Sequence, residues 1–284
     1  MLSLAALFCQ ESKLEQEPTL GGARTVFTMS WDDGHPLDLR LAELLAKFGF
    51  QATFYVPARF PPGGSCQTDG FQVLSGATLR ELAGRFEVGS HTLDHARLDT
   101  LSLGEAKRQI GEGKEWLEGE LGRSVRGFCY PGGYYTTAIS HLVRDAGFSY
   151  ARTTDDLYCG ASFDRFVIPV SFQFYGRGRK DFLRNFVKNP NRGLRYAMFS
   201  AAMLRKGFLN RLKAGLDYVC RKGGMFHLWG HSWELGHFDG WPMLESFLRY
   251  AADRVPRESR VTNSELVEAM TGARPSVSPR AASS

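Results

Sequence analysis

An α/β fold built on a parallel sheet is predicted by three features of the sequence. Short apolar runs alternate with segments of helical periodicity from residue 24 to residue 270. The composition, 43% hydrophobic and 23% charged, is that of an ordinary globular protein. Polar residues of catalytic type follow several apolar runs directly, and in parallel α/β folds such residues gather at the carboxyl ends of strands. Either a barrel or an open sheet satisfies these features.

Each element is predicted from its own local pattern. Pro36 suits a first helical turn, leucines then recur at helical spacing, and Gly49 can end that helix. Near the end of the chain, Asn263 and Ser264 are helix-capping residues. The predicted strands are 25–30, 52–56, 86–90, 127–130, 148–152, 165–170 and 225–229. The predicted helices are 37–48, 78–85, 103–121, 136–146, 242–252 and 266–270.

The chain termini and the cysteines bear on the compartment. Residues 1–23 are expected to form an N-terminal arm, because the apolar start has neither a preceding cation nor a small-residue cleavage site. Residues 271–284 are rich in Pro, Ser and Ala and are expected to be a disordered tail. The sequence has no apolar run of membrane-spanning length. Five scattered cysteines argue against a disulfide framework, so a cytoplasmic location, membrane-peripheral at most, is predicted.

Two adjacent carboxylates, Asp32 and Asp33, end the first predicted strand. Burying such a pair is costly unless hydrogen bonds or a cation compensate. Neighbouring residues on a strand point in opposite directions, so one carboxylate can bind a metal while the other remains a free base. The alternative interpretation is a solvated Asp-Asp-Gly turn.

A histidine pair follows the third predicted strand. His91 and His95 are spaced i, i+4, which places both imidazoles on one face of a helical turn. Two histidines with one carboxylate leave coordination positions open, as catalytic zinc sites do. The alternative is a pair of surface histidines. Together with Asp32 and Asp33, the pair predicts a metal site.

Two further segments lie at predicted strand ends. His231 follows a strand and a glycine, and an imidazole can donate a proton near neutral pH. His227 lies within that strand and is expected to be a half-buried structural residue. The strand 127–130 runs into Pro131-Gly132-Gly133, where glycines let backbone N–H groups approach a ligand. An ordinary turn is the alternative there.

These segments, in this order, resemble the polysaccharide deacetylase family, the NodB-homology type of carbohydrate esterase family four. The Asp-Asp-Gly of Asp32 to Gly34 and the His-Thr-x-x-His of His91 to His95 match its first two motifs. The resemblance implies a distorted (β/α) barrel of about seven repeats. It also implies a divalent ion, expected to be zinc. Its implied site residues are the metal ligands Asp33, His91 and His95, the catalytic base Asp32, the catalytic acid His231, and the substrate-binding residues Tyr130, Pro131, Gly132 and Trp229.

The implied function is metal-dependent removal of an N-acetyl group from an amino sugar in a polysaccharide, oligosaccharide or lipid-linked glycan. The catalytic domain would span 24–270. Departures from the family pattern leave alternatives open. Cys129 occupies the position of the arginine in the third motif, for which Arg126 or Arg152 could substitute. The fourth motif, an Asp and a Trp near the acid histidine, has no clear match, and Asp164 is the candidate for its acid. A carbohydrate-binding protein with a decayed site, or a hydrolase of another amide or an O-acetyl ester, is the second interpretation.

A basic helical insertion is predicted over 171–222. Residues 177–222 contain 13 Lys/Arg and two acids, whereas the rest of the chain has 22 Lys/Arg against 28 acids. A basic amphipathic segment can contact an anionic membrane or a phosphate-bearing glycan. The alternative is an insertion packed on the barrel with a solvated cationic face. No nucleic-acid partner is expected, because the sequence contains no recognised module.

Overall fold

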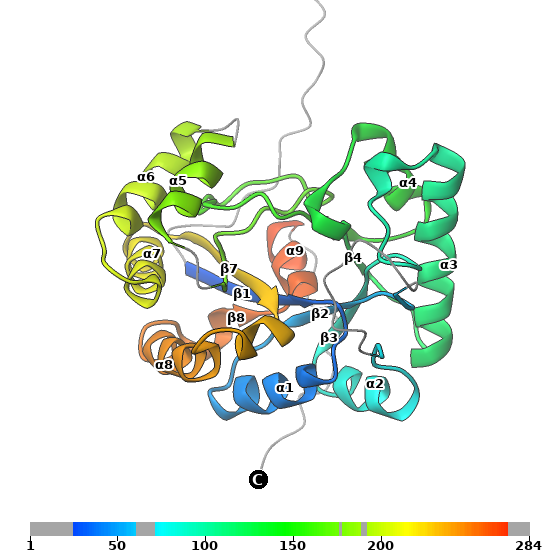
Figure 1. Cartoon of the computed structure of the whole chain (residues 1–284), viewed down its shortest axis with the longest axis horizontal. Helices are drawn as coiled ribbons and strands as arrows, with labels where there is room; N and C mark the ends of the chain where they lie inside the picture. Colours follow the sequence, from blue (N-terminus) through cyan, green and yellow to red (C-terminus); the bar gives the residue numbers. More distant parts are fainter. Residues whose placement is uncertain (1–24, 61–71, 176–177, 189–191, 272–284) are drawn as a thin grey trace, which may run out of the picture.

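A curled parallel sheet forms the centre of the molecule in the computed structural model, which describes residues 25–60, 72–175, 178–188 and 192–271 (Figure 1). Its strands are β1 (Thr25–Asp32), β2 (Thr53–Val56), β3 (Glu87–Ser90), β4 (Gly127–Cys129), β5 (Tyr150–Arg152), β6 (Phe172–Gln173), β7 (Gly224–His231) and β8 (Arg260–Val261). The strands pair in the order β5-β4-β3-β2-β1-β7-β6, all parallel, and β8 pairs with β1. The predicted parallel α/β fold is confirmed.

Helices surround this sheet (Figure 1). They are α1 (Leu37–Lys47), α2 (Gly76–Ala83), α3 (Leu103–Leu121), α4 (Thr137–Asp145), α5 (Arg179–Lys188), α6 (Arg192–Met203), α7 (Phe208–Lys222), α8 (Gly240–Ala252) and α9 (Asn263–Thr271). Short 3₁₀ turns are η1 (Leu98–Thr100), η2 (Pro131–Gly133), η3 (Trp233–Gly236) and η4 (Arg257–Ser259). No helix of the described residues is long and apolar enough to cross a membrane. The predicted arm 1–23 and nearly all of the predicted tail 271–284 lie outside the described residues.

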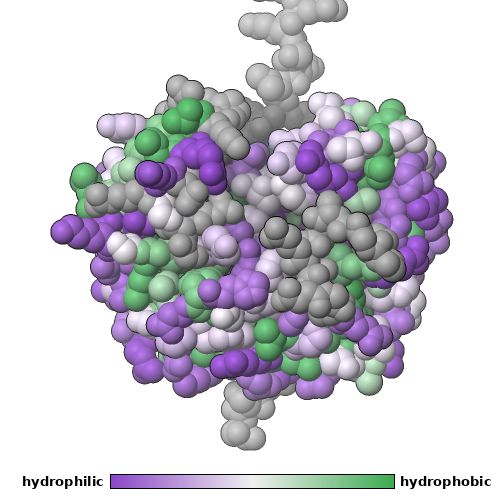
Figure 2. All heavy atoms as spheres, viewed as in Figure 1, coloured by the Kyte–Doolittle hydropathy of each residue, from purple (hydrophilic) through white to green (hydrophobic). Residues whose placement is uncertain are grey.

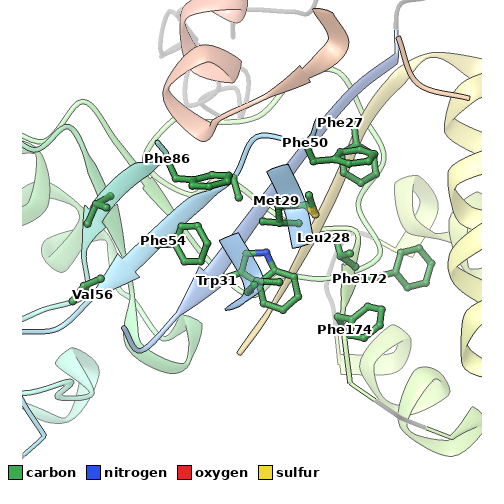
Figure 3. Packing of buried hydrophobic residues seen from close by; sticks show 14 of the residues in the cluster. Phe27, Met29, Trp31, Phe50, Phe54, Val56, Phe86, Phe172, Phe174 and Leu228 are labelled. Carbon is green, nitrogen blue, oxygen red and sulfur yellow. The ribbon is translucent and has the colours of Figure 1, made fainter. Parts of the chain in front are cut away.

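Side chains alternate along β1 and give the sheet two different faces. Phe27, Met29 and Trp31 enter the large hydrophobic core between the sheet and the helices (Figure 3). The intervening residues point to the inner face, where Thr28 Oγ1 donates to Asn263 Oδ1 at 2.8 Å. The period of two therefore carries Asp32 onto the polar inner face.

Helix α9 closes the inner face at the amino ends of the strands. Asn263 N–H donates to Thr53 Oγ1 at 3.0 Å, and Ser264 N–H donates to the Glu87 carboxylate at 3.1 Å. Thr53 and Glu87 are the first residues of β2 and β3. The carboxyl ends of the strands are thus left for the functional residues, which lie at the opposite end of the sheet.

The segment 165–170 was predicted as a strand, and that prediction is wrong. Its backbone contacts β5 through one isolated bridge, Arg152 with Ile168. Ile168 also accepts a hydrogen bond from Thr153 N–H at 2.9 Å. Pro169 has no N–H to continue a ladder, so the apolar run crosses the gap between β5 and β6 as irregular backbone.

The first residues of the predicted insertion 171–222 belong to the sheet, so the inserted segment starts later than predicted. Phe172 and Gln173 form β6, which pairs with Leu228 and Trp229 of β7 and so belongs to the sheet. The inserted helices are α5, α6 and α7. The ring of Phe186 on α5 stacks on a ring of α6, Phe199, with 4.2 Å between centroids.

Candidate active site

The predicted site residues meet at the carboxyl ends of β1, β3 and β7. Asp32 ends β1, His231 ends β7, and these two residues are register partners. His91 follows β3 directly. Because all three strands are parallel, their carboxyl ends lie at one edge of the sheet. The predicted placement of these residues at strand ends is therefore confirmed, although their chemical roles remain predictions.

Asp33, His91 and His95 form a compact group. Their ligand atoms all lie within 4.8 Å of one another. Asp33 Oδ1 is 3.2 Å from His95 Nε2 and 3.9 Å from His91 Nε2, and the two imidazole centroids are 4.7 Å apart. Two of the three side chains are almost fully buried. Three side chains of metal-ligating type converge here, which is the arrangement that a divalent cation stabilises.

The histidine pair does not lie on a helix, so the structural argument from i, i+4 spacing is wrong. The segment is irregular, and both Thr92 and His95 have left-handed backbone conformations, with φ of 70° and 53°. Helix α3 holds it from outside: Leu93 N–H donates to Gln109 O at 3.0 Å and Asp94 N–H donates to Gln109 Oε1 at 3.0 Å. The conformation of this loop, rather than a helical turn, therefore brings the two imidazoles together.

Hydrogen bonds to the outer atoms orient this group. His91 Nδ1 lies 2.8 Å from Cys129 O, which as an acceptor requires a proton on Nδ1 and leaves Nε2 unprotonated in the neutral ring. Trp233 Nε1–H donates to Asp33 Oδ2 at 2.9 Å. Asp33 Oδ1 is buried and has no hydrogen-bond partner within the described residues. A buried carboxylate oxygen without a donor, facing imidazole nitrogens, fits a metal cation.

Electrostatics also suits ligation. Burial, followed by the neighbouring His95, lowers the pKa of His91 to about 4, so this imidazole is neutral at neutral pH. Burial tends to raise the pKa of Asp33, but the surrounding His231, His95 and His91 outweigh it and lower that pKa. Neutral imidazole and ionised carboxylate are the protonation states that metals require.

A second group, Asp32, His91 and Cys129, also lies within ligand distance of one another. Burial raises the pKa of the Cys129 thiol well above its usual value, so the sulfur is protonated and a poor ligand. Asp32 is also engaged by an arginine. The Asp33 group is therefore the better metal site.

Asp32 is held by Arg152. The guanidinium Nη2 donates to Asp32 Oδ1, and the pair is buried, with 0% and 4% of the two side chains exposed. The guanidinium also lies over the rings of Tyr55, at 5.3 Å, and Trp229, at 5.0 Å. Of the two arginines proposed as substitutes for the third-motif arginine, Arg152 is thus the one that contacts Asp32. The Cys129 Sγ lies 3.8 Å from Asp32 Oδ2.

The other predicted substitutes lie elsewhere. Arg126 pairs with Glu268 of α9, at the opposite end of the sheet. Asp164, the guess for the fourth motif, accepts the Phe166 N–H at 2.8 Å.

His231 has an acidic partner three residues ahead. His231 Nδ1 and Glu234 Oε2 are 2.9 Å apart, and His231 Nε2 is 3.8 Å from Asp33 Oδ2. Burial alone would lower the pKa of His231, but Asp33 and Glu234 outweigh burial and raise it to about 9. The imidazole is therefore protonated at neutral pH and 17% exposed, which suits a proton donor. Trp233, which contacts Asp33, and Glu234, which contacts His231, had not been singled out from the sequence.

The four predicted substrate-binding residues differ in position. Tyr130 is fully buried, and its hydroxyl donates to Phe166 O at 3.0 Å, so its side chain packs in the core. Pro131 is buried in η2, whereas Gly132 is exposed with φ of 64°. Trp229 is only 8% exposed, and its ring meets His231 edge-on at 5.5 Å. Gly132 and the edge of Trp229 therefore remain as candidates for substrate contact.

Two buried polar residues lie behind the site. His227 is fully rather than half buried, and its Nε2 lies 2.8 Å from Ser30 Oγ. Asp38 of α1 is also fully buried, near Ser232 and the two site carboxylates, and burial raises its pKa well above the usual value. The sequence had not singled out Asp38, because a carboxylate in the first turn of a helix usually serves the helix dipole.

Comparison with known proteins agrees with the resemblance. Residues 21–151 match the family described as polysaccharide deacetylase, which confirms the predicted family for that part of the chain. No curated protein matches the sequence.

Solved structures also resemble the chain. A protein from Mycobacterium smegmatis described as a polysaccharide deacetylase is 18% identical, over 93% of this chain and 98% of that one, with a TM-score of 0.60. The Streptococcus pyogenes deacetylase PplD, in complex with acetate, is 18% identical over 50% of this chain, with a TM-score of 0.43. This chain spans 63% of PplD. A family 4 carbohydrate esterase from Streptomyces lividans, also with acetate, is 14% identical over 80% and 89%, with a TM-score of 0.46. The likeness to the Mycobacterium smegmatis protein shows that the fold is the predicted distorted barrel.

Proposed function

Residues 21–151 belong to the polysaccharide deacetylase family, and from that premise we propose that the chain is a metal-dependent hydrolase that removes an N-acetyl group from an amino sugar. The observation that carries the proposal is the buried Asp33 Oδ1, which faces His91 and His95 and has no hydrogen-bond donor among the described residues. Three ligands leave coordination positions open for water and substrate, as a hydrolytic metal centre requires.

Asp33, His91 and His95 would hold the divalent ion, and zinc suits two imidazoles with one carboxylate. When bound, such an ion supplies Lewis-acid polarisation of the acyl carbonyl and a more acidic water. The Cys129 carbonyl and the Trp233 indole fix the orientation of two of these ligands.

Asp32 is proposed as the general base that takes a proton from the attacking water. Its carboxylate lies on the inner face of the sheet, one residue before the ligand Asp33. Arg152 fixes the orientation of Asp32 Oδ1, while Oδ2 has a weak contact, 3.8 Å long, with the Cys129 thiol. One oxygen is thus anchored and the other is available to a proton.

His231 is proposed as the general acid that protonates the departing amine. Amide hydrolysis needs this step because an amide anion is a poor leaving group. The bond to Glu234 leaves Nε2 directed toward the Asp33 side of the site. A cation shared with Asp33 would offset part of the negative charge that raises the pKa of His231, bringing it from about 9 toward neutrality.

The backbone N–H of Gly132 is the proposed donor to the oxyanion. Gly132 is exposed at the start of the loop that follows β4, and its φ of 64° favours glycine. A Cβ at this position would lie 2.9 Å from the ring of Tyr134. A single donor of this kind contributes about 3 kcal/mol to the rate of acyl transfer.

The direct test measures acetate release from chitin-type oligosaccharides and other N-acetylhexosamine substrates, together with bound zinc. Asp32→Asn should lose at least 100-fold in kcat while retaining zinc, and His91→Ala should lose both zinc and activity. Asp145→Asn and His141→Ala, at exposed positions on α4, are the matched controls. Full activity in Asp32→Asn and His91→Ala would overturn the proposal.

The alternatives are separated by the same assay. A decayed carbohydrate-binding site was suggested by Cys129 and by an unmatched fourth motif. Arg152, Trp233 and Glu234 now occupy those places, which supports an intact enzyme. Zinc binding with acetate release only from O-acetylated sugars, or only from other amides, would replace the proposed substrate class but keep the metal site.

A further inference from the structure

Exposed hydrophobic side chains are concentrated on the inserted helices. Among the described residues, seven large hydrophobic side chains are exposed, and five of them lie between residues 175 and 204. These are Tyr175, Leu183, Val187, Tyr196 and Leu204. Leu204 is 83% exposed and Tyr196 is 62% exposed. Scattered single residues are normal on a protein surface, but a local cluster marks an interaction site.

One face of α5 combines aliphatic and cationic groups. Lys180, Leu183, Arg184 and Val187 are spaced i, i+3, i+4 and i+7, so they share one side of the helix. All four are exposed. On α5, Phe186 is half-buried and stacks on Phe199 of α6, as the inward side of a packed helix does. The outward face of α5 therefore carries exposed aliphatic side chains among its cations, where an ordinary surface helix is polar.

The end of α6 continues this surface with the turn Leu204-Arg205-Lys206, in which all three residues are exposed. Figure 2 shows hydrophobic side chains beside strongly hydrophilic ones at the corner of the molecule formed by α5 and α6. We call this surface the α5–α6 surface: Lys180, Leu183, Arg184, Val187, Tyr196, Leu204, Arg205 and Lys206.

The charge around this surface is positive. Residues 177–222 contain 13 Lys/Arg and two acids. One of the acids, Asp217, pairs with Arg254 at 3.1 Å and accepts the Tyr250 hydroxyl at 2.7 Å. Two of the cations, Arg195 and Arg211, are buried. Lys180 and Arg184 of α5 and Arg205 and Lys206 of the turn are exposed together with the aliphatic side chains.

We propose that the α5–α6 surface docks on an anionic lipid membrane. Aliphatic side chains interleaved with cations on one helix face are the pattern of helices that lie in a membrane interface. Anionic headgroups complement the cations, and acyl chains receive Leu183, Val187 and Leu204. Helix α5 follows β6, whose carboxyl end lies at the same edge of the sheet as the site. Docking therefore brings the site to a glycan at the membrane, a step that rests on the proposed function.

The test is co-sedimentation of the full chain with vesicles of phosphatidylcholine, with and without about one-third phosphatidylglycerol, at low and at physiological salt. The wild type should bind the anionic vesicles and lose binding as salt rises. Arg205→Ser/Lys206→Ser should weaken binding about 10- to 30-fold, since each cation near an anionic surface contributes about fivefold. Leu183→Ser/Val187→Ser should weaken it at least 10-fold.

The matched control is Leu103→Ser, because Leu103 is 55% exposed on α3, away from the inserted helices. It should bind vesicles like the wild type. Failure of the wild type to sediment with anionic vesicles at low salt would overturn the proposal. So would unchanged binding in Leu183→Ser/Val187→Ser, which would show that the vesicles are bound through charge alone, without insertion of the aliphatic side chains. Vesicle binding needs no catalysis, so this result is independent of the acetate-release assay.

Discussion

Replacement of Arg152 tests whether this residue holds the proposed base. In Arg152→Met the buried guanidinium is lost, and Asp32 keeps only the weak thiol contact with Cys129. Removing one partner of a buried ion pair costs about 3–5 kcal/mol, a large part of the ~5–15 kcal/mol of a typical domain. Urea unfolding should show this loss, and kcat should fall about 100-fold because the base is no longer held in position.

A compensating variant keeps the prediction falsifiable if Arg152→Met folds poorly. Cys129 and Arg152 are register partners on β4 and β5, so Cys129→Arg/Arg152→Ser moves the cation one strand toward the family position. This double variant should regain part of both the stability and kcat. The control Arg144→Met removes an exposed arginine of α4. If Arg152→Met retained wild-type kcat and stability, Arg152 would not be positioning Asp32.

Three further outcomes are expected. The metal-free protein should lose up to about 3 kcal/mol of folding free energy as pH rises from 6.5 to 9. The reason is that protonated His231, whose pKa is raised to about 9, stabilises the folded state, and this stabilisation is complete below pH 6.5. Urea titrations of His231→Gln should not show this loss. Zinc at 1,000 times its Kd should stabilise the wild type by about 4 kcal/mol, and thermal scans of Asp33→Asn should show no such gain. Asp38→Asn should be about as stable as wild type at acidic pH and up to about 1–3 kcal/mol more stable as pH rises, because burial raises the pKa of Asp38 and its ionised form is unfavourable there; equal urea midpoints from pH 5 to 9 would contradict this.

Most of the sheet was predictable because its central strands are buried on both faces. The run 25–30 became β1 and 225–229 became β7, each extended by a few residues at its carboxyl end. Phe27 and Met29 recur with a period of two, and 225–229 is apolar except for His227; both patterns are typical of strands. By contrast, β6 and β8 are two residues long and leave no periodicity to detect. The run 165–170 is as apolar as a strand, but Pro169 interrupts the hydrogen-bonding ladder.

The site was predictable in its residue types and less so in its local geometry. His91 and His95 lie together as expected, although the helical spacing was not the cause. Gln109 of α3 and two left-handed residues shape that loop, and neither is visible as a pattern in the loop itself. Trp233 and Glu234 could have been found, since a tryptophan and an acid lie two and three residues after His231 in the sequence. Asp38 could not, because only the fold brings it behind the site.

Arg152 shows why comparing a sequence with a motif position by position can miss a residue that reaches the same place from a neighbouring strand. Neighbouring strands of a sheet are about 4.8 Å apart, which is less than the reach of an arginine side chain. Arg152 on β5 lies beside Cys129 on β4 at the same height of the sheet. A guanidinium from either strand can therefore meet Asp32 on β1, and the small thiol leaves the space that Arg152 needs to cross. The rings of Tyr55 and Trp229 cover the guanidinium of Arg152. Because the ring of Trp229 also contacts His231, Trp229 lies between the arginine that holds the proposed base and the proposed acid. Substitutions at Trp229 should consequently disturb the proposed base and acid together.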